Sequence, residues 1–579
     1  MIETRTNQVH AVASSDGTGP YVEGSGGGDR RSVLTPLLLI VSLLLVAGFL
    51  FLLNNRTVNI FDEGILLTGT MRTMAGNVLH RDFYYNYGPG QLYLLAGLFK
   101  IFGPSVLVER LSECLLAAFL VLSVYWLTRR YCSRAVSVGA ACVCVLWVIG
   151  QMMYQSLMNP LCTFAVWASW LMLPVDNASR QRRNSLVAGL SAAMMFLFRY
   201  DMGAGLVAAN IASALLMFSM RERSLRRGLS GLHKNVLWSY VVGFAIPVVP
   251  AALAYLSVAP LHDLLYDVVI YNAKYYRFGR GLPLPKLVFG EAFENIVVYV
   301  LPVLIALGLW MAIDYSLRRR KETNASVVRL PEWVNLLIAA SITAAFLYVK
   351  GIVRLSAGQM YGSTMPCILV AAILFQHRAE LNIWLRGVFA AAVVLFIATA
   401  VSATDVRLVN GRHLRPLVVN WLVSPNRQPP WPPYRSLCQS GTPITRGMCF
   451  LLDPDRMKTV EYVDAHTTPA DPLYVGLSHH DRIYMNDNLT YFAAQRIPAT
   501  RWTQFDPFLE NRADIQREMI SDLEHNRPPY VVLDSEFENA GEPNGSSIST
   551  GVHLLDNYIA AHYSAVERFG EMTILKRDS

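Results

Sequence analysis

Long uninterrupted apolar runs constrain this 579-residue chain more than any other feature. The first run covers residues 33–53, and ten more follow before residue 404. Each is close to the ~20 residues that a helix needs to cross a ~30 Å hydrocarbon layer. Strands of an outer-membrane barrel would instead alternate apolar and polar residues over about ten positions. The later runs are 105–127, 135–150, 157–173, 185–198, 203–219, 236–258, 293–316, 333–349, 361–376 and 387–403.

These runs predict a polytopic α-helical membrane protein with about eleven transmembrane helices. The composition agrees, because 53% of the residues are hydrophobic and only 16% are charged, against about 25% charged residues in soluble proteins. A soluble enzyme and a disordered chain are therefore excluded. The net charge of +8 would suggest nucleic acid in a soluble protein, but here most basic residues sit in short loops between the runs.

The basic loops alternate with loops that are poor in Lys and Arg, and this alternation predicts the topology. Short basic loops stay on the cytoplasmic side, so the N-terminus is expected inside and loops 54–104, 259–291 and 350–360 outside. An odd number of helices also puts residues 404–579 outside. We expect a multi-pass protein of the cytoplasmic (inner) membrane. The basic clusters are Arg129, Arg130 and Arg134; Arg180, Arg182 and Arg183; Arg221 to Lys234; Arg318 to Arg329; and Arg378 and Arg386.

The sequence divides into three regions. Residues 1–32 are rich in Gly and polar residues and predict a disordered cytoplasmic arm. Residues 33–403 form the transmembrane domain. Residues 404–579 alternate short apolar strands, such as 473–477, with helix-like stretches, and they predict a small extracytoplasmic α/β domain.

Two of the eight cysteines lie in the polar, Pro-rich start of this last region. Cys438 and Cys449 would form a disulfide if the region faces an oxidising compartment. The other six fall in or beside apolar runs and are expected to be small core residues. His479-His480-Asp481 could suggest a metal site, but adjacent histidines on a strand point to opposite faces, which favours a solvated loop.

The outer loop 54–104 is too long and too polar to be a simple connector. Asp62 and Glu63 follow the first apolar run by about nine residues, and ionisable groups this close to a membrane are candidates for function. A carboxylate held in a cleft can act as general base on an acceptor hydroxyl. The alternative is structural, with Asp62 capping a helix that starts near Gly64 and Glu63 in its first turn.

The residues of this loop resemble the first outer loop of GT-C superfamily glycosyltransferases, such as protein O-mannosyltransferases and lipid A aminoarabinose transferases. The resemblance implies sugar transfer from a polyprenyl phosphate carrier, with the catalytic base in the pair Asp62 and Glu63. Its specific part covers about fifty residues, and the helix layout extends it over most of 33–400. The matching residues are Phe61-Asp62-Glu63-Gly64, Gly76, His80-Arg81-Asp82-Phe83-Tyr84-Tyr85, Tyr87-Gly88-Pro89-Gly90, Gly103-Pro104 and Glu109-Arg110.

Further polar residues of this and a later loop are candidates for the substrate cleft. We expect Arg81, Asp82, Tyr85 and Tyr87 from the first loop. Arg199 and Asp201 interrupt an apolar stretch at the outer end of a run, and they would form either a second wall of the cleft or an internal salt bridge.

A metal cofactor is not favoured by the sequence. Several GT-C enzymes carry an acidic residue in the outer turn between the third and fourth spans, whereas Gln155-Ser156-Leu157-Met158-Asn159-Pro160 has no carboxylate. A divalent cation prefers several oxygen ligands. We therefore expect no metal and no other cofactor, although a divalent cation is not excluded.

Basic and aromatic residues of loop 266–286 could bind the donor phosphate. Lys274, Arg277 and Arg280 would compensate its charge, and neighbouring tyrosines would sit at the headgroup level. The alternative is interfacial anchoring to anionic lipid. In the next outer turn, which also contains Lys350, the resemblance implies a phosphate-binding role for Arg354, while Ser356 and Gln359 stand where relatives often have Asp and His.

These observations favour an inverting glycosyltransferase that moves a monosaccharide from polyprenyl phosphate to an acceptor hydroxyl. The sequence has no P-loop, no GxSxG, no HExxH and no Gly-rich dinucleotide turn, so nucleotide-driven chemistry has no support. The expected partners are the lipid-linked sugar, membrane lipid and a glycan, lipid or protein acceptor, without nucleic acid. The alternatives are a secondary transporter, a lipid or polysaccharide flippase, and a noncatalytic envelope-assembly protein.

Overall fold

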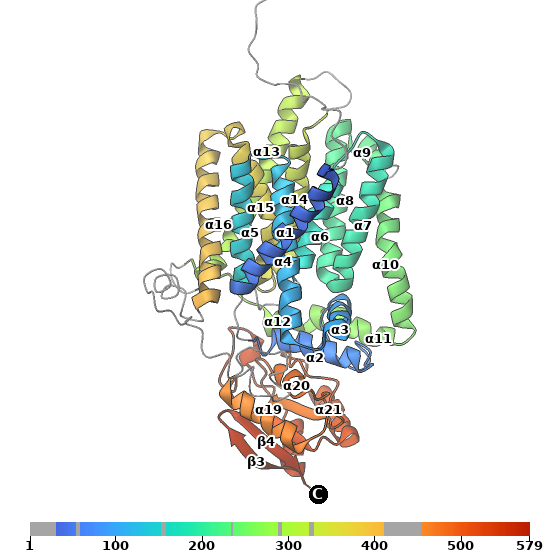
Figure 1. Ribbon diagram of the computed structural model, residues 1–579, viewed down its shortest axis with the longest axis vertical. Helices are drawn as coiled ribbons and strands as arrows, with labels where there is room; N and C mark the ends of the chain where they lie inside the picture. The colour runs from blue at the N-terminus through green and yellow to red at the C-terminus, as the bar shows by residue number, and fades with distance from the viewer. Residues whose placement is uncertain are drawn as a thin grey trace, which may run out of the picture.

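Every apolar run forms a helix in the computed structural model, which describes residues 30–53, 58–151, 158–232, 236–287, 292–322, 329–409 and 453–578. These helices form a bundle that ends on a smaller C-terminal domain (Figure 1). The predicted membrane fold is confirmed. The helices are α1 (Arg30–Leu53), α4 (Val106–Arg129), α5 (Arg134–Gln151), α6 (Met158–Leu171), α7 (Ala178–Phe198), α8 (Tyr200–Glu222), α10 (Trp238–Leu256), α13 (Val297–Glu322), α14 (Glu332–Gly351), α15 (Ala357–Gln376) and α16 (Ile383–Val409).

Within the described part of the chain, seven helices are long and apolar enough to cross a membrane, namely α4, α8, α10, α13, α14, α15 and α16. Helices α1 and α5 are apolar over shorter stretches. Helix α7 begins at Ala178, seven residues before the apolar run that predicted it, because Asn177 caps it by accepting a hydrogen bond from Arg180 N. Its first turns carry arginines, which apolar patterning alone does not include.

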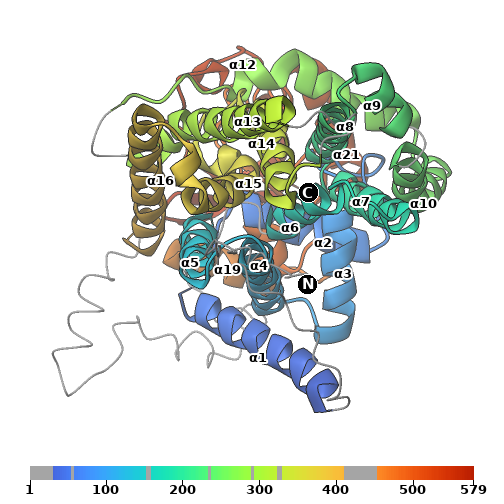
Figure 2. The same ribbon diagram turned by 90° about the horizontal axis from the view of Figure 1, so that it is seen from above.

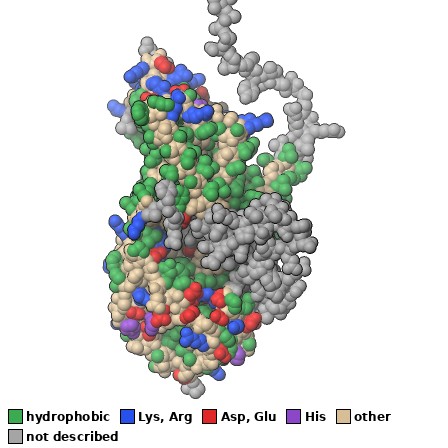
Figure 3. All heavy atoms as spheres, turned by 90° about the vertical axis from the view of Figure 1, so that its left-hand side faces the viewer, with side chains coloured by type: hydrophobic (Ala, Val, Ile, Leu, Met, Phe, Trp, Pro, Cys, Tyr) green, Lys and Arg blue, Asp and Glu red, His purple; other side chains and the backbone are tan. Residues whose placement is uncertain are grey.

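The bundle packs with α1 obliquely across α4, as Figure 2 shows from above. Basic side chains gather at the end of the bundle far from the C-terminal domain (Figure 3). We call this the Arg-rich end, and the opposite end the domain end. The described parts of the long connections predicted from the sequence, 58–104 and 259–287, both lie at the domain end.

These connections form short helices between the bundle and the C-terminal domain. Helices α2 and α11 lie across the domain end of the bundle (Figure 1). Both helices, of 13 and 5 residues, are shorter than a membrane span. The short helices here are α2 (Asp62–Met74), α3 (Gly90–Phe102), α11 (Leu261–Leu265), the π-helical turns η2 (Tyr266–Ile270) and η3 (Asn272–Tyr276), α12 (Arg277–Arg280) and η4 (Phe293–Ile296).

The C-terminal domain is a four-stranded sheet with helices, in the order β1-β2-β4-β3. Strands β1 and β2 are parallel, whereas β4 runs antiparallel to both β2 and β3. All five residues of β1 are buried, as expected for a strand covered on both faces. The elements are α19 (Pro454–His466), β1 (Leu473–Leu477), α20 (Leu489–Ala494), α21 (Ala513–Asn526), β2 (Tyr530–Asp534), η7 (Gly545–Ser547), α22 (Leu554–His562), β3 (Tyr563–Phe569) and β4 (Met572–Arg577).

Helix α2 joins the two parts through backbone contacts. The N–H groups of Asn488 and Leu489 both donate to Ile60 O, at 3.0 and 3.1 Å, and Thr68 Oγ1 donates to Asn488 O at 2.7 Å. A Cβ at Gly64 would lie 2.6 Å from Leu489 N, so only glycine allows this close approach. The residue after the acidic pair is thus fixed by docking to the C-terminal domain.

Three predictions concern residues outside the described ranges. They are the arm 1–32 over residues 1–29, the disulfide between Cys438 and Cys449, and residues 155–157 of the turn 155–160. Residues 30–32 of the predicted arm belong to the first turn of α1 instead. His479, His480 and Asp481 lie in a loop after the end of β1, as predicted. The prediction that this loop is solvated is wrong for His480, which is fully buried with its Nδ1 2.6 Å from Asp556 Oδ1, because it packs inside the C-terminal domain. The six remaining cysteines are free, and five of them are buried.

Candidate active site

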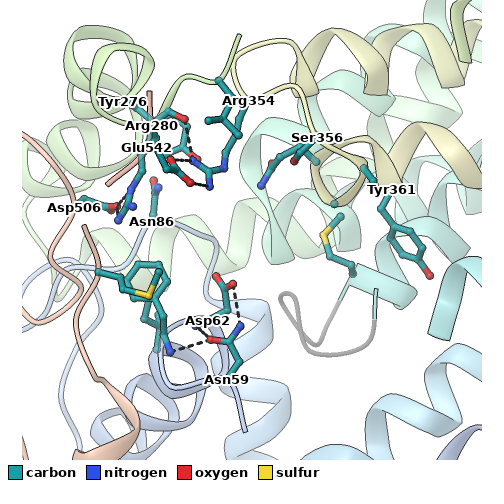
Figure 4. Close-up of a pocket in the computed structure, with 18 of the residues that line it drawn as sticks. Asn59, Asp62, Asn86, Tyr276, Arg280, Arg354, Ser356, Tyr361, Asp506 and Glu542 are labelled. Carbon is teal, nitrogen blue, oxygen red and sulfur yellow. Dashed lines mark hydrogen bonds and ion pairs between the residues drawn. The ribbon is translucent and has the colours of Figure 1, made fainter. Parts of the chain in front are cut away.

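A polar cavity of about 510 Å³ opens between the domain end of the bundle and the C-terminal domain. Its walls come from the start of α2, from η3 and α12, from the turn before α15, and from loops of the C-terminal domain. Figure 4 shows Asp62 pointing toward this cavity, with Arg280, Arg354 and Glu542 grouped across from it. We call it the catalytic cavity.

Asp62 lies in the first turn of α2 rather than capping the helix. The cap is Phe61, and Asn59 Oδ1 accepts the N–H groups of Phe61 and Asp62, each at 2.9 Å. Asn59 Nδ2 lies 3.5 Å from Asp62 Oδ2. The prediction that Asp62 caps this helix is therefore wrong, because the helix starts two residues earlier than predicted and Asn59 binds its first amides. The Asp62 carboxylate faces the cavity instead. Glu63 does lie in the first turn, as predicted.

Glu63 points away from the catalytic cavity, into the protein. Its side chain is buried and forms an ion pair with Arg110 of α4, with 2.6 Å between Glu63 Oε1 and Arg110 Nη2. Glu63 Oε2 accepts the Asn59 N–H at 2.7 Å. Glu63 thus binds Asn59, which in turn binds Asp62, and the Glu63 carboxylate itself lies outside the lining of the cavity.

We expect Glu63→Ala to destabilise the protein by about 1–3 kcal/mol, because it removes the nearer carboxylate partner of buried Arg110 and leaves Glu109, 3.5 Å from Arg110 Nε, as the other. Thermal unfolding of the detergent-solubilised protein measures this loss. Asp62→Ala is the matched control, since Asp62 lines a cavity and its removal should change stability little. Equal unfolding temperatures for the two variants would contradict the assigned roles.

Two arginines on the far wall are each paired with a carboxylate of the C-terminal domain. Arg280 Nη2 lies 3.0 Å from Asp506 Oδ1, and Arg280 also donates to Tyr484 O and Phe505 O. Arg354 binds Glu542 with both Nη atoms, one of them at 2.6 Å. Burial alone would lower the pKa of Arg354, but Glu542 reverses this and raises it, so Arg354 stays charged.

An apolar groove of about 850 Å³ lies next to the catalytic cavity. Its walls are α8, α10, α14 and the segment from α11 to η3, and most of the lining side chains are aliphatic or aromatic. Asn86, Tyr87, Tyr276, Arg354 and Gln359 line both spaces. The polar and apolar spaces therefore meet at these five residues.

The groove is basic where it meets the catalytic cavity. Lys350 Nζ donates to Gln359 Oε1 at 2.9 Å and lies 4.0 Å from Asp201 Oδ2. Arg199 Nε lies 3.1 Å from Asp201 Oδ1, and its guanidinium stacks 4.5 Å above the Tyr87 ring. Arg199 and Asp201 form a salt bridge in which Arg199 is buried and the Asp201 side chain is 47% exposed, and both line the groove and not the catalytic cavity.

Besides Glu63, five predicted site residues lie away from both spaces, and these assignments are corrected. Arg81 and Asp82 pair with each other near the surface, where the Arg81 hydrogen bond lowers the pKa of Asp82. Tyr85 is buried and donates to Gln91 Oε1 at 3.0 Å. Lys274 and Arg277 are exposed. In the turns that carry them, Tyr276 and Arg280 face the cavity, and Lys274 and Arg277 project outward.

Several lining residues were not assigned a role from the sequence. Asp506 and Glu542 come from the C-terminal domain, about 440 and 480 positions after Asp62, and no local pattern marks them. Lys350 was noted beside Arg354 without a role. The sequence signal that could have identified Lys350 is its position as a basic residue at the end of an apolar helix.

Comparisons with known proteins agree with this geometry. Residues 86–253 match the family described as dolichyl-phosphate-mannose-protein mannosyltransferase. ArnT from Cupriavidus metallidurans, solved with bound undecaprenyl phosphate, is similar with a TM-score of 0.51 and 12% identity, over 94% of this chain and 98% of that chain.

Two further solved structures are similar at lower scores. The apo state of the same ArnT gives 0.48 and 14% identity over the same shares of both chains. The apo oligosaccharyltransferase of Archaeoglobus fulgidus gives 0.41 and 14% identity, over 86% of this chain and 70% of that chain. No curated protein sequence matches the chain.

The chain therefore shares the fold of a membrane glycosyltransferase of the GT-C type and is similar, over residues 86–253, to the mannosyltransferase family. The ArnT likeness, at 12% identity, establishes the fold. The resemblance seen in the first outer loop is thereby confirmed, within a region that the family match partly covers.

Proposed function

We propose that this chain is an inverting glycosyltransferase that moves a monosaccharide from polyprenyl phosphate to an acceptor hydroxyl at the outer face of the cytoplasmic membrane. The observation that supports the proposal is that the catalytic cavity, which contains Asp62, meets the apolar groove. A lipid-linked sugar likewise has a polar sugar and an apolar isoprenoid chain, which a phosphate joins. ArnT, which shares the fold, was solved with undecaprenyl phosphate.

The donor would be divided between the two spaces. Its isoprenoid chain fits the apolar groove between α8, α10 and α14. Its phosphate fits the junction, where Lys350 and Arg354 supply charge and Tyr87 and Tyr276 contribute to the lining. Its sugar then extends into the catalytic cavity toward Asp62.

The reaction would be a single displacement. Asp62 takes the proton of the acceptor hydroxyl, and the acceptor oxygen attacks the anomeric carbon from the face opposite the phosphate. The bond between the anomeric carbon and the phosphate oxygen breaks, and the polyprenyl phosphate leaves with its electron pair. Lys350 and Arg354 stabilise the charge that develops on the leaving group.

The outer-face location rests on charge. Lys and Arg gather at the Arg-rich end of the bundle (Figure 3), and such loops remain cytoplasmic. The catalytic cavity and the C-terminal domain are at the opposite end, where no nucleotide is needed because the donor is lipid-linked. A secondary transporter would instead have ionisable residues near the midplane of two related halves.

Turnover of radiolabelled polyprenyl phosphate sugars by the purified protein tests the proposal. Several donors, carrying hexoses, pentoses and amino sugars, are supplied with a membrane lipid and glycan extract as acceptor. Release of polyprenyl phosphate together with a labelled product of inverted anomeric configuration is expected. Absence of release from every donor, from protein that is folded, would overturn the proposal.

We expect turnover to survive treatment with EDTA, because the cationic side chains at the junction can replace a metal in stabilising the phosphate. Among described residues, the group of His, Asp and Glu side chains close enough to hold a metal is Asp481, His553 and Asp556, in the C-terminal domain. Product is measured after chelation and after adding back magnesium, manganese or calcium. Activity that vanishes and returns with one ion, in His553→Ala as well as in wild type, would make the mechanism metal-dependent.

A further inference from the structure

A second polar cavity, of about 250 Å³, lies in the C-terminal domain. Leu477 and Asp534 line it, and they are the last residues of the parallel strands β1 and β2. In open α/β sheets, ligands bind in the crevice outside the carboxyl ends of the strands. The position of this cavity in the fold is therefore that of a binding site. We call it the sheet-edge cavity.

The lining of the sheet-edge cavity suits a neutral, hydroxyl-rich ligand. Ser478, Ser549 and Asn539 offer both donors and acceptors. Asp481 already accepts from Ser549 Oγ, and Glu538 Oε1 lies 3.0 Å from His479 Nε2, but each carboxylate has further lone pairs that can accept from sugar hydroxyl groups. Acidic residues outnumber the arginine in the lining, which disfavours a phosphate or carboxylate ligand.

The size and lining of the sheet-edge cavity limit the ligand further, to a single sugar ring. The volume is slightly below the roughly 300–1,000 Å³ of cavities for drug-sized ligands, so one sugar ring would fill it. Phe537 supplies an aromatic side chain in the same lining, and an apolar surface beside a few placed polar groups is how such sites fix orientation. A single pyranose or furanose ring combines these properties.

The same two segments of chain form walls of both the sheet-edge cavity and the catalytic cavity. In residues 477–485, His479 lines the sheet-edge cavity and Tyr484 lines the catalytic cavity. In residues 534–549, Glu538 lines the former and Glu542 the latter. The rings of Tyr484 and Phe537 join the two segments, with their centroids 6.0 Å apart.

We propose that the sheet-edge cavity binds one sugar ring of a carbohydrate acceptor whose reacting end lies in the catalytic cavity. This inference rests on the proposed function and names the acceptor class as a glycan. It gives the C-terminal domain a role in the reaction, because the domain then holds the acceptor while the bundle holds the donor. Glu538 and Asn539 are exposed and line the cavity, so they are suitable for substitution.

Saturation-transfer NMR on the full-length protein in detergent tests binding directly. The probes are the methyl glycosides of glucose, galactose, mannose, N-acetylglucosamine and arabinose. At least one should receive saturation, and the double variant Glu538→Gln/Asn539→Ala should lose about tenfold in affinity, as expected for two hydrogen-bonding groups. Glu524→Gln on α21 is the matched control, because Glu524 is an exposed glutamate of the same domain that lies outside the lining.

The variants also identify which cavity binds the probe. Binding retained in Asp62→Asn and lost in Glu538→Gln/Asn539→Ala supports the proposal. Loss in Asp62→Asn with retention in the double variant would place the sugar in the catalytic cavity and overturn it. Saturation of no probe at all would overturn it as well.

A transfer assay with matched acceptors connects the cavity to the reaction. Once a donor is found, a disaccharide acceptor should show a lower KM than the corresponding monosaccharide, and Glu538→Gln/Asn539→Ala should remove the difference. Equal KM values in the wild type would contradict the proposal. Failure of every donor concerns the proposed function alone, because the NMR experiment requires no turnover.

Discussion

Asp62→Asn is expected to lower the rate of sugar transfer by about 10²- to 10⁴-fold, the usual contribution of a general base. The amide keeps the shape of the side chain and leaves its neighbour Asn59 in place, but it cannot take the acceptor proton. Donor binding should change little, because the cationic junction at Lys350 and Arg354 is untouched. Single-turnover rates and the Kd of polyprenyl phosphate, both on purified protein, measure the two effects.

Asp82→Asn is the control for this variant. Asp82 is a carboxylate of the same loop, paired with Arg81 and absent from the linings of the catalytic cavity and the groove, so transfer should stay near the wild-type rate. If Asp62→Asn keeps near-normal turnover, the base has been misassigned. Glu294 and Asp506 line the same cavity and would be the next carboxylates to test.

The helix bundle could be predicted from the sequence because the thickness of a bilayer fixes the length of an apolar run. The eleven runs all became helices, with the largest difference at the start of α7, where arginines extend the helix beyond the apolar stretch. The short helix α11 was not predicted, and α2 was considered only as a helix starting near Gly64. They lie across the bundle end, so no fixed length or continuous hydrophobicity marks them.

The candidate site could be predicted only in part. Asp62 and Arg354 line the catalytic cavity as expected, and their importance came from the resemblance and from their place near membrane edges. Lys274 and Arg277 are basic residues on the outward side of turns that carry Arg280 on the inner side. Charge in a sequence does not show which side of a turn faces the protein, and the π-helical geometry of η2 and η3 shifts the usual 3.6-residue spacing.

Contacts between distant segments could not be predicted at all. Glu542 follows Arg354 by 188 positions, and Asp506 follows Arg280 by 226. Nothing in the local sequence distinguishes either carboxylate from an exposed acidic residue. Each becomes part of the cavity only when the C-terminal domain packs against α2. This explains why the arginines looked like free phosphate ligands in the sequence, while the structure pairs both.

Arg354→Ala is expected to reduce transfer by about 10²- to 10³-fold, the scale for removing one group that stabilises developing charge, and to weaken polyprenyl phosphate binding. Arg354 is the arginine that lines the groove as well as the catalytic cavity, so it is placed to bind a phosphate at their junction. Arg354→Lys should recover part of the loss, since it restores the charge without the planar fork. Transfer rates and phosphate lipid binding are the measurements.

Arg354→Ala also leaves the Glu542 carboxylate without its bidentate partner. A second variant can therefore separate a loss of stability from a loss of phosphate binding. The double variant Arg354→Ala/Glu542→Gln should restore thermal stability toward wild type, since the unpaired charge is gone, while transfer stays low. Arg320→Ala is the control at the Arg-rich end, where Arg320 donates to Ser219 O and Met220 O. If the double variant regains activity along with stability, or if Arg320→Ala loses as much transfer, then Arg354 supports the fold and the phosphate is bound elsewhere.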